Sequence, residues 1–236
     1  MSSRYEFHEL KVIHVFVWPL KLLWKILYIY GVLCALCVAI FLLAAHYLWA
    51  APVEGAYQIY RHSMEASTLL GTHSRATWLV QQSADFAYWL FFQVTQLHDI
   101  LSRLTHNIAN SGTDATIGER LLRPWLKELW IAALAVKTFG CRLMLLLTGW
   151  PVLLLAFCCG MTDGLVERSI RRVSAGRESS GLYHRAKYAQ LSLGATSVLV
   201  FVCLPYQLDV RWVLFPIAVT IGILARTQWK FLKKYL

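Results

Sequence analysis

The chain has 236 residues, of which 58% are hydrophobic and only 15% are charged, and its formal net charge is +10. Soluble domains contain about 25% charged residues and a smaller apolar share, so this composition argues against an ordinary soluble domain and for a membrane protein. The positive charge fits either nucleic acid or an acidic membrane surface, and its distribution along the chain decides between them.

The first long apolar run extends from Ile26 to Leu48. It exceeds the apolar core of about 7–15 residues that is typical of a cleaved secretory signal, and no convincing small-residue cleavage site follows it. The run therefore predicts a retained membrane span over residues 26–48. Lys21 and Lys25 precede this span, and basic residues favour the cytoplasmic side for the end that carries them.

Residues 50–128 form the largest segment between predicted spans, and acidic and basic side chains nearly balance in it. This balance suits the outer side of the membrane. Apolar residues recur at helical spacing in its second half, which predicts amphipathic helices whose apolar face packs on the bundle or on the bilayer surface. The residues on that face are Phe86, Leu90, Val94, Leu97, Leu101 and Leu104.

The second span is predicted at residues 143–162, which contain no charged side chain. A run of that length crosses a hydrocarbon core about 30 Å thick. Pro151 lacks a backbone donor and predicts a kink inside the span. Lys137 and Arg142 precede the span, and we expect them to extend their charged ends to the outer interface rather than to form a buried relay.

A basic hairpin over residues 163–190 follows, in which Glu167 and Arg171 predict an intrahelical ion pair that continues the helix past the bilayer. Two further apolar runs predict spans at residues 191–208 and 212–225. Basic residues then fall on one side of the membrane at every crossing. We therefore expect an all-α polytopic membrane protein with four spans, both termini in the cytoplasm, and one integrated domain over residues 1–236.

The sequence DGLVER at Asp163 begins like the metal-binding motif of membrane CDP-alcohol phosphotransferases, but Ser180 and His184 stand where that motif needs two aspartates. Mg²⁺ requires carboxylate oxygens, so we exclude this enzyme. No glycine-rich nucleotide loop is present either. We expect no catalytic residues, no cofactor, no metal site and no enzymatic activity. A small transporter, or a membrane enzyme of unknown substrate, is the alternative, and a transporter would use the break at Gly149 and Pro151.

The basic hairpin is the candidate contact surface. Basic groups beneath an anionic leaflet gain about 1 kcal/mol each, so anionic lipid headgroups are expected partners. Because lipid and topology account for most of these charges, we expect no direct contact with nucleic acid. The candidate partner or lipid contacts are Arg168, Arg171, Arg172, Arg177, Glu178, His184, Arg185 and Lys187.

Several stretches carry a resemblance to a known family, namely AAPVEGAYQIYR, TGWP, DGLVERSIRR, GRESSGLYHRAK, PYQLDVRWVLFP and the closing KKYL. They resemble the integrating conjugative element membrane proteins of the DUF4400 type, over nearly the whole chain. The resemblance implies a non-enzymatic accessory or scaffold component of conjugative DNA transfer, related to type IV secretion, in the bacterial inner membrane. The partners that it implies are other membrane proteins of the conjugation apparatus and the coupling ATPase.

Overall fold

The structure is a computed structural model, and it describes residues 3–69, 74–109, 123–174 and 180–232. These residues form helices and no strand, which confirms the all-α class. Four helical stretches are long and apolar enough to cross a membrane, and each overlaps one predicted span. They are Trp18–Tyr47, Leu126–Val173, Gly181–Cys203 and Val210–Lys230.

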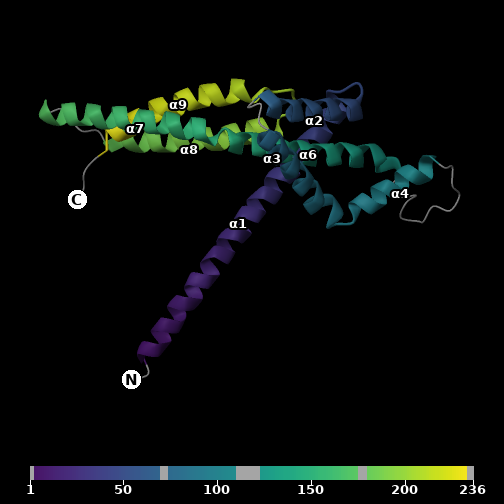
Figure 1. The fold of residues 1–236 in the computed structure, drawn as a ribbon, viewed down its shortest axis with the longest axis horizontal. Helices are drawn as coiled ribbons and strands as arrows, with labels where there is room; N and C mark the ends of the chain where they lie inside the picture. The colour runs from purple at the N-terminus through teal and green to yellow at the C-terminus, as the bar shows by residue number, and fades with distance from the viewer. Residues whose placement is uncertain (1–2, 70–73, 110–122, 175–179, 233–236) are drawn as a thin grey trace.

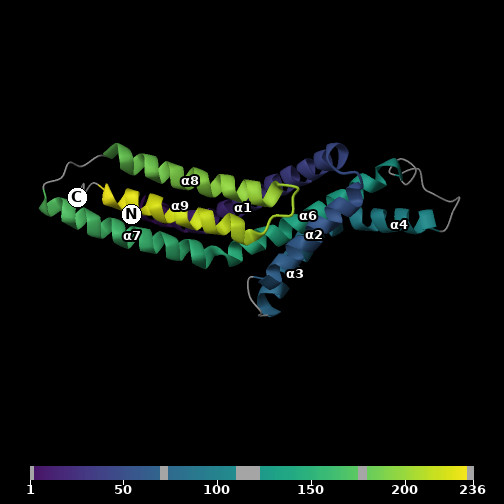
Figure 2. The same cartoon turned by 90° about the horizontal axis from the view of Figure 1, so that it is seen from above.

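Three of the long helices form an elongated bundle. α9 (Val210–Lys230) packs between α7 (Trp150–Val173) and α8 (Ser180–Cys203), as Figures 1 and 2 show. α6 (Leu126–Thr148) extends beyond one end of this bundle and continues the course of α7. α1 (Ser3–Tyr47) contacts α6 and α8 with its second half, while its first half leaves the bundle obliquely (Figure 1).

The first helix is longer than the predicted span, because it begins at Ser3 rather than at Ile26 and continues through Pro19. The large apolar side chains between Trp18 and Ile29 are exposed, whereas Cys34, Cys37 and Phe41 are buried against the other helices. Apolar side chains that face lipid need no protein partner, since hydrocarbon is as apolar as they are. A long exposed apolar helix is therefore compatible with a span.

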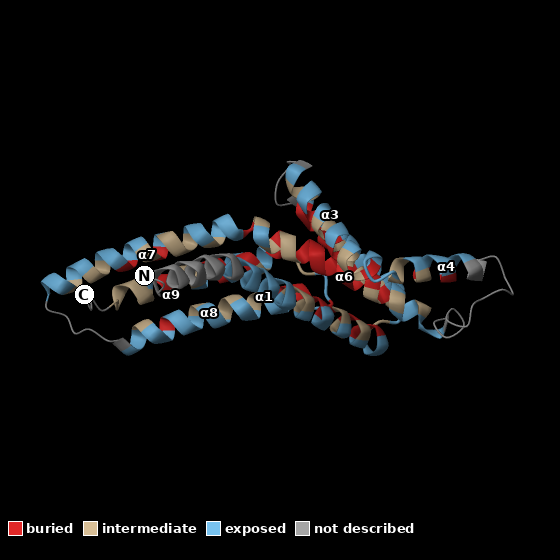
Figure 3. Cartoon of the chain, turned by 90° about the horizontal axis from the view of Figure 1, so that it is seen from below, coloured by how far each residue is buried: buried red, intermediate tan, exposed pale blue. Residues whose placement is uncertain are grey.

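The segment after α1 folds into helices that surround α6. These are α2 (Pro52–Leu69), α3 (Ser74–Tyr88), the π-helical turn η1 (Trp89–Gln93) and α4 (Leu97–Ala109), and the 3₁₀ turn η2 (Arg123–Trp125) leads into α6. We call α2, α3, η1, α4 and α6 the helical cap. Buried residues concentrate on α6 (Figure 3), so the cap has its own apolar core and the predicted amphipathic helices pack against protein.

The predicted apolar face of this segment is correct at one end and wrong at the other. Leu101 and Leu104 of α4 are buried, whereas Phe86 and Val94 are 54% and 57% exposed. η1 contains the wider turn of a π-helix, and the chain turns again at Gln96, whose φ is 59°. Both features shift the helical face, so a constant spacing of three and four residues does not hold across them.

The break predicted between α6 and α7 is confirmed. Gly149 separates the two helices, and Pro151 lies in the first turn of α7, where its missing N–H costs no helical hydrogen bond. The apolar helical stretch nevertheless starts at Leu126 and ends at Val173, well outside the predicted limits. At about 1.5 Å per residue, α6 and α7 together exceed the thickness of the hydrocarbon core more than twofold, so part of them must lie outside it.

The third span ends earlier than predicted. α8 begins at Ser180 and ends at Cys203, whereas the predicted span continued to Leu208. Pro205 has no N–H with which to continue the helix. The Asp209 carboxylate then accepts a hydrogen bond of 3.0 Å from the Arg211 backbone N–H and caps the start of α9.

Candidate functional site

The basic end of the bundle comprises residues 163–174 at the end of α7, 180–190 at the start of α8 and 226–232 at the end of α9. α7 and α9 pack closely, and this packing brings the side chains of the basic end together. A Cβ added at Gly160 would lie 2.1 Å from the Gly222 carbonyl oxygen, and one added at Gly164 would lie 2.5 Å from the Arg226 carbonyl oxygen. Such small residues let membrane helices approach closely.

This approach creates a network of ion pairs between α7 and α9. Arg226 Nε lies 2.8 Å from Asp163 Oδ2, and another nitrogen of the same guanidinium pairs with Glu167. Lys230 Nζ lies 2.5 Å from the second oxygen of Glu167. Since these side chains are partly exposed to solvent, each pair contributes at most about 1 kcal/mol. The network therefore fixes the relative position of two helix ends more than it stabilises the fold.

The predicted ion pair between Glu167 and Arg171 is wrong. Glu167 turns to the two basic residues of α9, which the sequence places about sixty positions away. The Arg171 guanidinium instead lies 4.0 Å from the centre of the ring of Phe231, the residue that follows α9. Glu167 and Arg171 thus both contact the end of α9 rather than each other.

The network leaves a surplus of positive charge. The described residues of the basic end contain seven Lys or Arg side chains and two acids, and both acids are engaged with Arg226 and Lys230. Five basic side chains there have no acidic partner within the described ranges. They are Arg168, Arg171, Arg172, Arg185 and Lys187.

The structure thus brings the predicted contact residues to one end of the molecule. Arg172, His184, Arg185 and Lys187 are exposed, and Arg168 and Arg171 are half-buried. Arg177 and Glu178 lie outside the described residues, so the prediction for those two positions is not tested.

Arg142 is a buried cation, which corrects the expectation that it extends to the interface. Its side chain is 1% exposed and donates hydrogen bonds to the carbonyl oxygens of Phe201, Leu204 and Tyr206 and to Ser63 Oγ. The carbonyls at the end of a helix have no intrahelical donors and carry partial negative charge. They therefore act as the counter-charge of Arg142, and none of the ion pairs among the described residues includes it.

The sequence held one signal for this site. Arg142 lies inside α6, four residues after Thr138 and three before Leu145, and both of these neighbours on its face are buried. A cation on the buried face of a helix cannot reach water, so it needs partners in other elements. Local sequence does not identify those partners, since they come from α2 and from the connection between α8 and α9.

The chemistry available at the basic end is electrostatic. Its two acids are paired with basic groups, and most of its exposed charged side chains are cationic. Across the described ranges, no three His, Cys, Asp or Glu side chains come together as a metal site would require. The basic end is thus suited to contact an anionic surface, whether of lipid or of protein.

The four candidate spans, the helical cap and the basic end define a polytopic membrane protein with a strongly asymmetric distribution of charge. Residues 53–233 match the model of the DtrJ-like family, which is described as "IncC plasmid conjugative DNA transfer protein DtrJ-like". Because the match covers well over half of the chain, the chain belongs to this family. Comparisons with curated proteins and with solved structures gave no match.

Family membership implies a role in conjugative DNA transfer, and it confirms the expected link to a conjugation-associated membrane family. The narrower expectations concern an integrating element, a type IV secretion apparatus and the inner membrane. Those expectations stay predictions.

Proposed function

We propose that this protein is a non-enzymatic scaffold of the conjugation machinery in the bacterial inner membrane. In this proposal the basic end faces the cytoplasm and docks an acidic surface of the coupling ATPase, while the membrane helices contact other membrane proteins of the apparatus. Family membership supports the part of the proposal that concerns conjugation, since the description of the family names conjugative DNA transfer. The observation that carries the docking role is the surplus, at one end of the bundle, of five basic side chains that have no acidic partner among the described residues.

The proposed orientation rests on charge and on the course of the chain. Basic residues near the ends of spans favour the cytoplasmic side. The end of α9 lies at the basic end (Figure 1). α1 leaves the bundle obliquely, but along the long axis of the bundle its beginning points to the same side, as two cytoplasmic termini require. Anionic lipid headgroups are expected around the same basic side chains.

The ion pairs between α7 and α9 favour a protein partner in addition to lipid. A topology signal needs only net positive charge, and it gains nothing from Asp163 and Glu167. These acids lock the basic end of α7 onto α9 through Arg226 and Lys230, so the surface is already ordered before a partner binds. Pre-ordering lowers the entropy lost on association.

The test removes two exposed positive charges from the basic end and, in a second variant, two from the cap. The conjugation frequencies of the two variants are then compared. The variant Arg172→Gln/Arg185→Gln should lower conjugation frequency while its membrane level and topology stay unchanged. The matched control is Arg75→Gln/Arg103→Gln, which removes two exposed arginines from the cap. A photo-crosslinking residue at position 172, but not at position 103, should capture the coupling ATPase during active transfer.

Two results would overturn the proposal. One is normal transfer by Arg172→Gln/Arg185→Gln, which would reduce the basic end to a topology signal. The other is crosslinking of the ATPase from position 103 rather than from position 172, which would place the cap on the side of the motor.

A further inference from the structure

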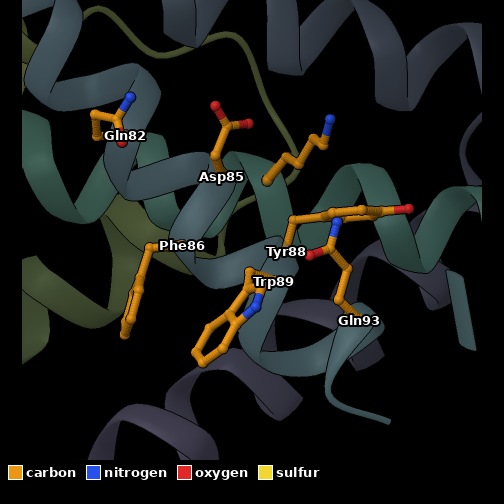
Figure 4. A pocket seen from close by; sticks show the side chains of 7 residues that line it. Gln82, Asp85, Phe86, Tyr88, Trp89 and Gln93 are labelled. Atoms are coloured by element: carbon orange, nitrogen blue, oxygen red, sulfur yellow. The ribbon is translucent and has the colours of Figure 1, made fainter. Parts of the chain in front are cut away.

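A hollow of about 530 Å³ opens in the helical cap, where α3 and η1 meet α6 (Figure 4). Its volume falls within the range of about 300–1,000 Å³ that is usual for small-molecule sites. Its lining combines three aromatic rings with two amides and two opposite charges. The lining residues are Gln82, Asp85, Phe86, Tyr88, Trp89, Gln93 and Lys137.

The π-helical turn shapes one wall of this hollow. The Val94 backbone N–H donates to the Trp89 carbonyl oxygen at 3.0 Å, five residues back, and this wider turn contains Gln93. π-helical turns inside α-helices are rare and often accompany functional sites. Here the turn leaves Trp89 46% and Phe86 54% exposed, with their ring centroids 6.0 Å apart.

Two opposite charges border the hollow without pairing. No ion pair involves Asp85 or Lys137 in the part of the chain that the structure describes. The Lys137 ammonium lies 4.7 Å from the centre of the Tyr88 ring, and the Tyr88 hydroxyl forms a hydrogen bond of 2.7 Å with His98 Nδ1. Burial raises the pKa of Tyr88, so its phenol stays neutral and adds no negative charge beside Lys137. An unpaired cation and an unpaired anion on one hollow complement a zwitterion.

The hollow lies near the end of a candidate span, where a helix would pass from bilayer to water. Lys137 precedes Arg142 by five residues on α6, a rise of about 7.5 Å. Arg142 binds the carbonyls that end α8, and Cys203 marks the end of that candidate span. Figure 4 shows Phe86 and Trp89 pointing to the opposite side from the Asp85 carboxylate. Aromatic rings on one side and charges on the other are typical of the membrane interface.

We propose that this hollow binds a zwitterionic phospholipid with a primary ammonium headgroup, taken from the leaflet next to the cap. The phosphate pairs with Lys137, and the ammonium donates to the Asp85 carboxylate. The amide of Gln82 or Gln93 reaches the remaining polar oxygens of the headgroup, and the acyl chains run along Phe86 and Trp89. This site is independent of the basic end, and it anchors the cap to the bilayer surface.

The experiment is native mass spectrometry of the full chain in detergent, titrated with phosphatidylethanolamine, phosphatidylcholine or phosphatidylglycerol. The wild type should retain phosphatidylethanolamine in preference to phosphatidylcholine, whose quaternary ammonium has no N–H to donate to Asp85. Asp85→Asn should remove this preference by weakening phosphatidylethanolamine about tenfold, because a neutral amide oxygen replaces the charged acceptor of the ammonium N–H. Lys137→Gln should weaken both phosphatidylethanolamine and phosphatidylglycerol.

The controls are Asp99→Asn and Lys127→Gln, which remove exposed charges of the cap that do not line the hollow and should leave retention unchanged. All variants should keep the wild-type unfolding midpoint, since the charges removed are exposed or half-buried. Equal retention of phosphatidylethanolamine and phosphatidylcholine by the wild type would overturn the proposal. Displacement of the lipid by an equal concentration of chain-free glycerophosphoethanolamine would also overturn it, since the ligand would then be a soluble phosphate ester.

Discussion

α6 and α7 follow each other in one apolar helical stretch, yet they are buried by different means. α6 is enclosed by helices of the cap, and consecutive residues from Thr138 to Arg142 are all buried. α7 buries only Gly160 and Gly164, and its large residues such as Leu155 are exposed. Around α6, apolar side chains are enclosed by protein as in the core of a domain in water. Around α7, lipid is an equally good neighbour, and only close backbone packing distinguishes protein from lipid.

The difference shows that hydropathy does not report burial in this protein. Leu155 is 66% exposed in α7, although Leu145 in α6 is 1% exposed. In the cap, large side chains determine which surfaces meet. In the bundle, a few glycines determine which helix surfaces meet, because they have no side chain to keep the backbones apart.

The largest effect expected from this comparison is that of a side chain at the α7–α9 contact. Gly160→Leu should destabilise the fold by more than about 4 kcal/mol, because a Cβ there would meet the Gly222 backbone, which cannot move aside. Gly194→Leu in α8 is the matched control, since nothing lies within 4 Å of its Cβ position. Detergent-resistant folded protein should be lost in the first variant only. Equal yields and unfolding midpoints would show that α7 and α9 do not pack as described.

The next largest effect concerns the buried cation of α6. Arg142→Met should cost about 3 kcal/mol, because the carbonyls at the end of α8 would lose their donor inside the protein. Arg61→Met is the control, since that side chain is 68% exposed in its pair with Glu65 and should change stability by less than about 0.5 kcal/mol. Thermal unfolding in detergent micelles measures both. An unchanged midpoint for Arg142→Met would mean that Arg142 reaches water.

A smaller effect is expected for truncation of an apolar side chain in the cap. Leu101→Ala should cost about 2 kcal/mol or slightly more, because Leu101 is 3% exposed in the core around α6. Val94→Ala should be nearly neutral, since Val94 is 57% exposed beyond the π-helical turn. Chemical unfolding of the two variants measures both losses and tests whether Leu101, rather than Val94, lies on the buried face. A larger loss from Val94→Ala would restore the face that regular helical spacing predicts.

The smallest effect is expected for the ion pairs at the basic end. A double-mutant cycle with Glu167→Gln and Lys230→Gln should give a coupling of about 0.5 kcal/mol, which decreases at high salt because the pair is partly exposed. The same cycle between Glu167→Gln and Arg171→Gln should give no coupling, since Arg171 lies on the Phe231 ring. A larger coupling to Arg171 would restore the intrahelical pair predicted from the sequence.

The sequence alone determined the class, the approximate spans and the asymmetry of charge. These features depend on the composition of continuous segments, since a bilayer selects runs of about 20 apolar residues and basic residues cluster at one side. The break at Gly149 and Pro151 was equally local, because proline is suited to the first turn of a helix and so marks where its own helix begins.

Tertiary structure alone decided which charges meet and which faces are buried. Glu167 pairs with Arg226 and Lys230 rather than with Arg171, because α7 and α9 lie side by side. Arg142 donates a hydrogen bond to the Leu204 carbonyl oxygen at the end of α8 for the same kind of reason, since α6 and α8 are in contact. The π-helical turn moved Phe86 to the surface, although regular spacing placed it on the inner face. Periodicity predicts which residues share a face of one helix. It does not identify the helix that packs against that face, because that partner comes from a distant part of the sequence.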